Sequence, residues 1–154
     1  MTNLVTDELL AEYVSVAAAL SASAIFADVQ QRSGVMSSVI KPIDPGKKLV
    51  GRAVTAHLSA GDLQDPLAAL DIAHPGDVIV IDAGGDTETS VWGGLMGSLF
   101  MLRGVGGAVI DGSCRDSDEN RAQGFQVFSR SVTPRGTHTI FSGRKDNVQL
   151  QVPV

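Results

Sequence analysis

Residues 110–119, IDGSCRDSDE, bring together side chains that could bind a small acid and a metal ion. The guanidinium of Arg115 is a planar fork that suits a carboxylate or a 2-oxo group. The carboxylate of Asp116 could hold a hard cation, since Mg²⁺ commonly takes only one or two protein carboxylates and keeps several waters. The pattern predicts a site for a metal-chelating 2-oxo acid; the plainer interpretation is a solvated turn that opens a helix.

A second segment with binding potential is Gly93, Gly94, Leu95 and Met96, where a loop becomes a helix. Free backbone N–H groups and the positive dipole at a helix start favour an anion, and glycine lets a ligand approach the backbone closely. The alternative is that these glycines only allow a helix and a strand to pack closely. Short motifs have a high false-positive rate, so spacing alone leaves both interpretations open.

Two strands and a helix are expected to bring these segments together. The β-branched run at 77–82 is typical of a strand covered on both faces, 95–103 reads as a buried helix, and 107–111 reads as the next strand. Such a βαβ unit should be parallel and right-handed. Because both following loops leave the carboxyl ends of neighbouring strands, Gly93-Gly94 and Arg115-Asp116 should face one another.

The rest of the chain also mixes helical and strand-like patterns, which predicts an α/β fold: a compact layered domain with βαβ units and a central, mainly parallel sheet. At 154 residues the chain should form a single α/β domain, residues 1–154. The other expected elements are helices at 6–20, 22–29, 62–73 and 116–123, strands at 49–59, 125–129 and 147–154, and a turn at 41–48.

Composition narrows the class of protein. The net charge is −5 without a basic block, so neither nucleic acid nor an anionic membrane surface is an expected partner. The start of the chain lacks the pattern of a signal peptide, and no uninterrupted run of about 18 apolar residues predicts a membrane span. A single cysteine, Cys114, leaves no pair for an internal disulfide. We therefore expect a cytoplasmic protein.

Several blocks of the sequence together resemble one known family. The blocks are VGRAVTAHLSAGD, GDVIVIDAGGDTETSVWGGLMG, RGVGGAVIDGSCRDSDENRAQGFQVFSRSVTPRG and VPV, and their core is Gly94, twenty residues, Arg115-Asp116, two residues and Glu119. The chain is similar to the family that contains the regulator of ribonuclease activity A and the 4-hydroxy-4-methyl-2-oxoglutarate aldolases. The resemblance covers nearly the whole chain and implies a layered, swivelling β/β/α-like α/β fold.

The resemblance also implies an activity and a site. The activity would be that of a divalent-metal-dependent (class II) pyruvate aldolase for 4-hydroxy-4-methyl-2-oxoglutarate-like 2-oxo acids, with decarboxylation of oxaloacetate by the same chemistry. The backbone of Gly93, Gly94, Leu95 and Met96 and the side chain of Arg115 would hold pyruvate, and Asp116 would carry Mg²⁺ or Mn²⁺. The resembled aldolases have an acidic residue at the position of Gly94, whereas glycine occurs there in members whose activity is regulatory or unproven.

Competing interpretations follow from other residues. The stretch VIVIDAGGD imitates the fingerprint of methyltransferases that bind S-adenosylmethionine, but residues 83–93 separate its strand from the next helix, where nucleoside sites use a tight turn. Cys114 could be a reactive thiol, yet no base is expected beside it, so a buried spectator is favoured. His57, His74 and His138 have no metal-ligand spacing.

The main rival to an enzyme is a non-enzymatic regulatory protein that binds and inhibits a ribonuclease through its surface. Both interpretations are compatible with a homo-oligomer. The alternating segment 147–154 should form a half-buried strand with an apolar row and an open edge, which proteins normally cover. The resembled family assembles as trimers or hexamers with the site between subunits. We therefore expect a trimer or a dimer of trimers, with the 93–96 segment and Arg115 near the interface.

Overall fold

A computed structural model describes residues 6–19, 21–58, 64–137 and 148–153. Its centre is one seven-stranded sheet whose strands follow the order β1-β6-β5-β3-β2-β7, with β4 paired to β5 off that path. The strands are β1 (Lys41–Pro42), β2 (Arg52–His57), β3 (Val78–Asp82), β4 (Ser90–Trp92), β5 (Gly107–Cys114), β6 (Gln126–Val132) and β7 (Val148–Pro153). The helices are α1 (Asp7–Ala19), α2 (Ala22–Val29), α3 (Gln64–Ile72), α4 (Gly94–Leu102) and α5 (Ser117–Gln123).

The sheet is parallel at its centre and antiparallel at its edges. Strands β2, β3, β5 and β6 run parallel to one another, while β1 pairs with β6 and β7 pairs with β2 in antiparallel fashion. The expected α/β fold with a mainly parallel sheet is therefore confirmed. The βαβ unit built by β3, α4 and β5 is confirmed as well, with Val78 opposite Gly107 and Asp82 opposite Asp111. The expectation that its helix is buried needs a correction, because Leu95, Met101 and Leu102 of α4 are exposed.

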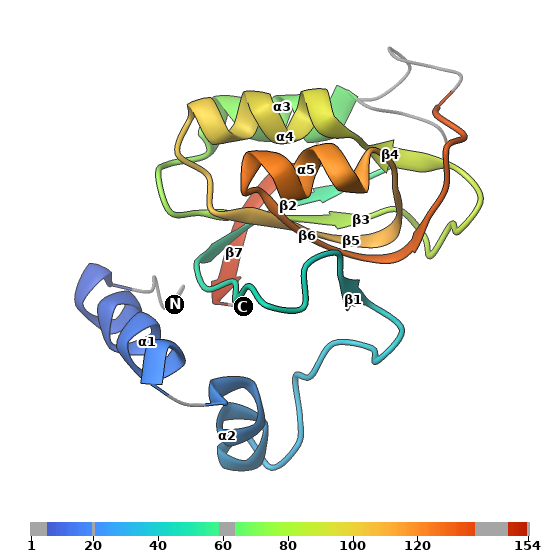
Figure 1. The fold of residues 1–154 in the computed structure, drawn as a ribbon. Helices are drawn as coiled ribbons and strands as arrows, with labels where there is room; N and C mark the ends of the chain where they lie inside the picture. Colours follow the sequence, from blue (N-terminus) through green and yellow to red (C-terminus); the bar gives the residue numbers. More distant parts are fainter. Residues whose placement is uncertain (1–5, 20, 59–63, 138–147, 154) are drawn as a thin grey trace.

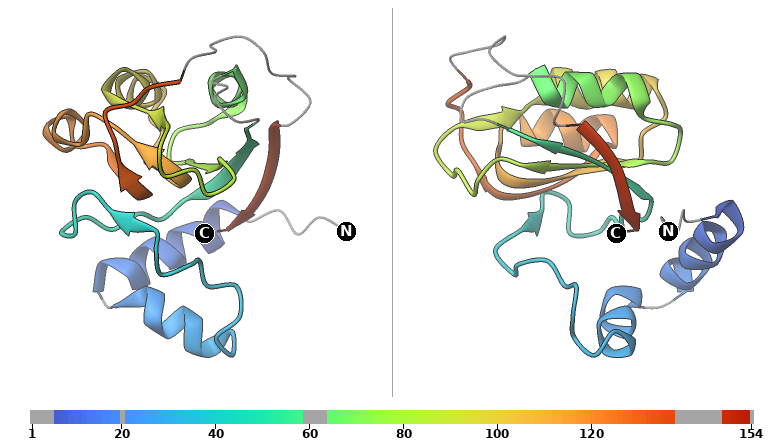
Figure 2. Two further views of the ribbon diagram at one scale, coloured as in Figure 1. Left: turned by 90° about the vertical axis from the view of Figure 1, so that its right-hand side faces the viewer. Right: turned by 180° about the vertical axis from the view of Figure 1, so that it is seen from behind.

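Three helices cover one face of the sheet and enclose the core. Figure 1 shows α3, α4 and α5 on the same side, and the side view in Figure 2 separates this helical layer from the strands beneath it. The inward-facing side chains of β3 and β5, including Ile79, Ile81 and Ile110, are fully buried against Phe100 of α4. Alternation along each strand explains this pattern, because every second side chain points to the covered face.

The two N-terminal helices lie on the opposite side of the sheet and apart from the helical layer (Figures 1 and 2). Tyr13 of α1 packs on Phe26 of α2, with ring centroids 4.8 Å apart. The Nζ of Lys48 donates to the carbonyl of Ala17. Arg52 of β2 forms an ion pair with Asp7, the first residue of α1. No helix within the described residues is both long and apolar enough to traverse a bilayer.

The structure corrects several expected boundaries. The expected strand 107–111 continues to Cys114, so residues 112–114 are strand and not loop. A further short strand, β4, lies in the region read as loop, and β1 lies within the expected turn at 41–48. The C-terminal strand is confirmed as β7, at the sheet edge as predicted. The side chains of its apolar row lie outside the described residues.

The remaining expected elements are confirmed with small shifts at their ends. The helices expected at 6–20, 22–29, 62–73 and 116–123 correspond to α1, α2, α3 and α5. The strands expected at 49–59 and 125–129 correspond to β2 and β6, of which β6 is three residues longer at its C-terminal end. Helix ends commonly shift by one or two residues, so these differences do not alter the fold.

Candidate functional site

The candidate site is anchored by Trp92, the last residue of β4. Its side chain is 1% exposed and lies between two aromatic rings: it stacks on Phe125 at 5.6 Å and packs on Phe100 at 5.2 Å. Buried aromatic side chains contribute large apolar area, which fixes the backbone that carries them. The next residues, Gly93 and Gly94, are therefore held at the edge of the core where α4 begins. Trp92 therefore packs the loop ahead of α4 against the core.

Strand β4 joins the two candidate segments through the backbone. Trp92 is in register with Cys114 in the parallel pairing of β4 with β5. The Trp92 carbonyl accepts the Arg115 N–H at 2.8 Å and the Ser90 hydroxyl at 2.8 Å. Because the Arg115 N–H is bound to the residue that precedes Gly93, Arg115 lies directly beside Gly93 at the end of β5. The prediction that the 93–94 and 115–116 segments face one another is confirmed.

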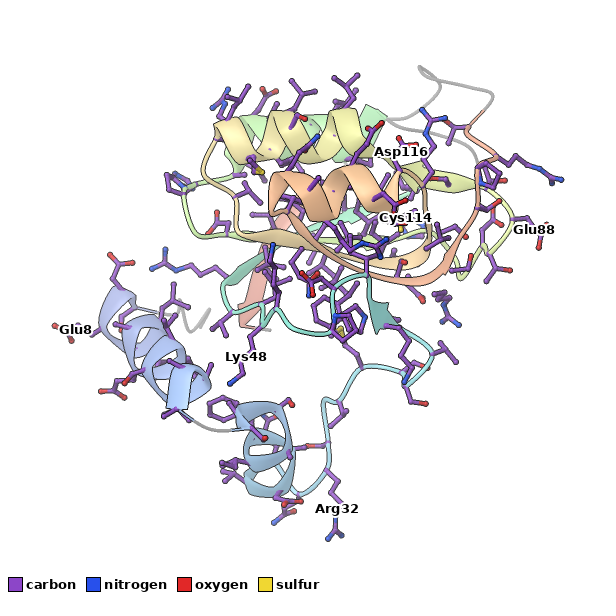
Figure 3. The ribbon with its side chains drawn as sticks, viewed as in Figure 1. Glu8, Arg32, Lys48, Glu88, Cys114 and Asp116 are labelled. Carbon is purple, nitrogen blue, oxygen red and sulfur yellow. The ribbon has the colours of Figure 1, made fainter. Side chains whose placement is uncertain are left out.

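Asp116 faces the start of α4. Its Oδ2 accepts the Gly94 N–H at 3.0 Å and lies 3.4 Å from the Nε of Arg115. Figure 3 shows Asp116 where helices α4 and α5 begin, with Cys114 on the sheet below. The expectation of free backbone N–H groups at the start of this helix thus needs a correction at Gly94, whose N–H is bound to Asp116. Leu95 and Met96 keep the first-turn N–H groups that lack an intrahelical acceptor.

The backbone at Asp116 is left-handed, with φ 52° and ψ 40°. A non-glycine residue in this region is uncommon, although aspartate is tolerated there better than most residues. The buried side chain of Asn120 holds the turn, because its Nδ2 donates to the Asp116 carbonyl at 3.0 Å. Asn120 also donates its own N–H to that carbonyl at 3.0 Å. The conformation that aims the Asp116 carboxylate at α4 is therefore fixed by α5.

Glu119 brings a second carboxylate to the same place. A β-carbon built on Gly94 would overlap the Oε2 of Glu119 and would lie 3.2 Å from its Cβ. A β-carbon on Gly93 would lie 2.6 Å from the Oδ2 of Asp116. The two carboxylates thus flank the adjacent glycines at the start of α4. Glu119 belongs to the motif recognised in the sequence, but its place over Gly94 was not predicted.

Arg115 lies among these groups with 48% of its side chain exposed, and the side chain of Asp116 is 36% exposed. Both can therefore reach a ligand in solvent. The described residues contain no group of three or more histidine, cysteine, aspartate or glutamate side chains arranged to hold a metal. One or two carboxylate oxygens fit Mg²⁺ or Mn²⁺, which prefer hard oxygen ligands and retain waters, and do not fit a closed zinc cage.

The remaining residues weighed in the sequence lie apart from this chemistry. Cys114 is fully buried with its Sγ 3.3 Å from the Ser129 hydroxyl, and burial raises the pKa of its thiol. A buried, neutral thiol is a poor nucleophile, which agrees with the spectator role expected for it. The Nδ1 of His57 lies 3.0 Å from a carboxylate oxygen of Asp82 in an exposed pair. His138 lies outside the described residues.

Gly136 also belongs to the surroundings of the site and was missed in the sequence. A β-carbon on Gly136 would lie 2.8 Å from the Nη1 of Arg115. It comes from the segment after β6, twenty-one positions further along the chain than Arg115. The only sequence signal was the turn-like run TPRG, which carries no information about which side chain it would meet.

The chain is similar to several known proteins. A "Putative 4-hydroxy-4-methyl-2-oxoglutarate aldolase" of Halalkalibacterium halodurans is 38% identical over 98 residues, 64% of this chain and 47% of that protein. The chain therefore spans about half the length of this relative. Streptomyces coelicolor RraAS2, described as an unusual member of the RNase ES inhibitor RraA protein family, superimposes with TM-score 0.70 and 25% identity over 96% of this chain and 72% of that one.

A second similar structure bears on the methyltransferase interpretation. A Geobacillus kaustophilus structure named S-adenosylmethionine:2-dimethylmenaquinone methyltransferase has TM-score 0.69 and 24% identity, over 79% of this chain and 76% of that one. At that identity the likeness shows the fold alone. Strand β4 lies between β3 and α4, so the tight glycine turn of a nucleoside site is not formed there.

A sequence model of the RraA-like family, Aldolase/RraA, matches residues 2–154, and the chain belongs to that family.

Proposed function

We propose that this chain is a divalent-metal-dependent lyase that cleaves a carbon–carbon bond in small 2-oxo acids. The substrates would be 4-hydroxy-4-methyl-2-oxoglutarate-like acids, cleaved to release pyruvate, together with oxaloacetate, which would be decarboxylated. The observation that supports this most is the meeting of one guanidinium and two carboxylates at the start of α4, formed by Arg115, Asp116 and Glu119. The aldolase name of the Halalkalibacterium relative agrees with it.

Arg115 would bind the substrate carboxylate. Its guanidinium is half exposed, and its fork can donate two parallel hydrogen bonds to one carboxylate. The first-turn N–H groups of Leu95 and Met96 lie at the positive end of α4 and would add favourable charge for the same anion. The side chain of Leu95 is 75% exposed, whereas that of Met96 is buried. Recognition at 93–96 would therefore use the backbone.

Asp116 would hold the cation, Mg²⁺ or Mn²⁺, with its carboxylate, and Glu119 is close enough to the same glycines to support it. When bound, the cation would polarise the 2-oxo group and stabilise the negative charge that develops on its oxygen. Asp116 is already oriented for this role by the Gly94 N–H and by the left-handed turn. Preorganisation of this kind lowers the cost of binding a charged ligand.

Glu119 is our candidate for proton transfer. The resembled aldolases have an acid at position 94, and here the Glu119 carboxylate occupies the space where a side chain on Gly94 would begin. In a retro-aldol cleavage, Glu119 would accept the proton of the substrate hydroxyl and deliver a proton to the methylene carbon of the departing pyruvate unit. Glycine at 94 would thus make room for an acid supplied by α5.

Turnover of oxaloacetate tests the enzyme proposal. Decarboxylation should require added Mg²⁺ or Mn²⁺, stop with a chelator, and fall about a hundred-fold or more in Asp116→Asn, as expected when a group that stabilises developing charge is lost. Asp118→Asn is the matched control, since this exposed carboxylate of α5 pairs with Arg121. If Asp116→Asn keeps full activity while folded, the metal assignment is wrong.

Oxalate, a mimic of the pyruvate enolate, tests the anion site separately. It should compete with substrate in the wild-type protein and bind much more weakly to Arg115→Lys, because lysine keeps the charge and loses the planar fork. Equal inhibition of both proteins would place the substrate elsewhere.

A second candidate function is a regulatory protein that binds and inhibits a ribonuclease. The likeness to Streptomyces RraAS2 supports it, and so do two exposed apolar side chains on α4, Leu95 at 75% and Leu102 at 85%. Folded wild-type protein that binds neither oxalate nor a divalent cation, and turns over neither substrate, would favour this function. Binding would then be measured with a purified ribonuclease.

We also propose that the chain assembles as a homo-oligomer, a trimer or a dimer of trimers. The edge of the sheet supports this, because β7 lies at the end of the described strand order, and proteins normally cover an open strand edge. Light scattering at micromolar concentration decides the matter, and a monodisperse 16.0 kDa species would contradict the proposal.

A further inference from the structure

The position of the Arg115 guanidinium is limited by two glycines from different parts of the chain. A β-carbon on Gly93 would lie 3.1 Å from its Nε and 3.2 Å from its Cγ. A β-carbon on Gly136 would lie 2.8 Å from its Nη1 and 3.6 Å from its Cζ. The Arg115 side chain therefore lies against the bare backbone of Gly93 near its stem and of Gly136 at its tip. Distances below about 3.4 Å would force a neighbour to move if a methyl group were added.

Gly136 is held in place by the backbone of the strands that build the site. The Ser90 N–H donates to the Arg135 carbonyl at 2.7 Å, and Ser90 forms a parallel bridge with Gly136. The Thr133 N–H donates to the Cys114 carbonyl at 2.9 Å. The segment from Thr133 to Gly136 thus lies fixed beside β4 and β5. A methyl group on Gly136 would displace the arginine and not the segment.

We propose that Gly136 is a positioning residue for Arg115, and that the absence of a side chain there sets where the guanidinium meets the substrate carboxylate. This inference rests on the proposed function of Arg115. The φ of Gly136 lies outside the left-handed region, so alanine can adopt the same backbone. The atom that must move is the far end of a half-exposed side chain, so the fold should tolerate the change. The cost should fall on ligand binding.

The test compares Gly136→Ala with Gly106→Ala in the full chain. Gly106 is an exposed glycine whose added β-carbon would meet no described atom closer than 3.6 Å, so it is a matched control. Both variants should melt close to the wild-type protein. Oxalate binding in the presence of Mg²⁺, measured by calorimetry, should weaken about ten-fold or more in Gly136→Ala alone, the change expected when a charged hydrogen bond is lost.

Introducing Gly136→Ala into the Arg115→Lys variant distinguishes a positioning effect on Arg115 from a general disturbance of the site. Lysine lacks the Nη1 and Cζ atoms that Gly136 accommodates, so Gly136→Ala should have little further effect on oxalate binding in that background. An equal loss in both backgrounds would overturn the proposal. So would unchanged oxalate binding in Gly136→Ala when the wild-type protein binds normally.

A readout without ligand keeps the inference separate from the proposed function. The Nε–H resonance of Arg115, assigned by its absence in Arg115→Lys, should shift in Gly136→Ala and stay in place in Gly106→Ala. If the wild-type protein does not bind oxalate, the proposed function fails while this resonance still decides whether Gly136 positions Arg115. An unmoved resonance would refute the positioning role.

Discussion

Replacing Gly97 with alanine should destabilise the protein, against the usual trend for helices. Gly97 lies inside α4, where alanine is favoured over glycine by about 1 kcal/mol. Here a β-carbon would overlap the Oδ1 of Asn120 and lie 3.4 Å from its Cγ. Asn120 is fully buried and its Nδ2 is bound to the Asp116 carbonyl, so a shift of its side chain would disturb that hydrogen bond.

The expected size of the effect follows from three contributions. Overpacking of a close helix contact costs about 1–3 kcal/mol. Moving Asn120 also weakens the hydrogen bond that holds the Asp116 turn, which is worth about 1 kcal/mol. After the gain in helix propensity, Gly97→Ala should lower the free energy of unfolding by about 1–3 kcal/mol. For a chain of this size, that corresponds to a fall in melting temperature of roughly 3–10 °C.

Thermal and urea unfolding would measure the change, with Gly97→Ala placed in two backgrounds. In Asn120→Ala the obstructing side chain is absent, so the same change should become neutral or stabilising by up to about 1 kcal/mol. Oxalate binding should weaken in Gly97→Ala as the Asp116 turn shifts. A higher melting temperature for Gly97→Ala in the wild-type background would refute the packing argument, and so would the same effect in both backgrounds.

Other predictions concern the core and two titrating groups. Phe100→Ala should cost about 3–5 kcal/mol in chemical unfolding, because the ring is fully buried between α4 and the sheet. Burial raises the pKa of the Cys114 thiol, so its stabilisation is present below the ordinary thiol pKa and is lost as the pH rises through the raised value. Labelling of Cys114 by a thiol reagent at pH 8 should therefore track unfolding, and rapid labelling of native protein would contradict this. Hydrogen bonding from the Gly84 N–H, with a smaller effect of His57, lowers the pKa of Asp82. Its stabilisation should be present above the ordinary carboxyl pKa and vanish as the pH falls through the lowered value, so Asp82→Asn should flatten acid unfolding below about pH 4.

The local patterns of the sequence were sufficient to predict the β3–α4–β5 unit and the parallel direction of its two strands. A β-branched run, an apolar helical run and a second strand each have a period that can be read within a few residues. Because parallel strands bring their carboxyl ends to one edge, the meeting of Gly93-Gly94 with Arg115-Asp116 followed from topology alone. The family resemblance then implied that these residues bind pyruvate and a metal ion, which their spacing alone could not indicate.

Only the tertiary structure decided how the site is completed. Strand β4 is three residues long and exists through its pairing with β5, so no local pattern could reveal it. The extension of β5 to Cys114 depends on its pairing with both β4 and β6. The place of Glu119 over Gly94 and of Gly136 against Arg115 depends on how close α5 and the segment after β6 come to the start of α4. Such contacts join residues far apart in the chain, and their distances are set by packing, which a single sequence does not display.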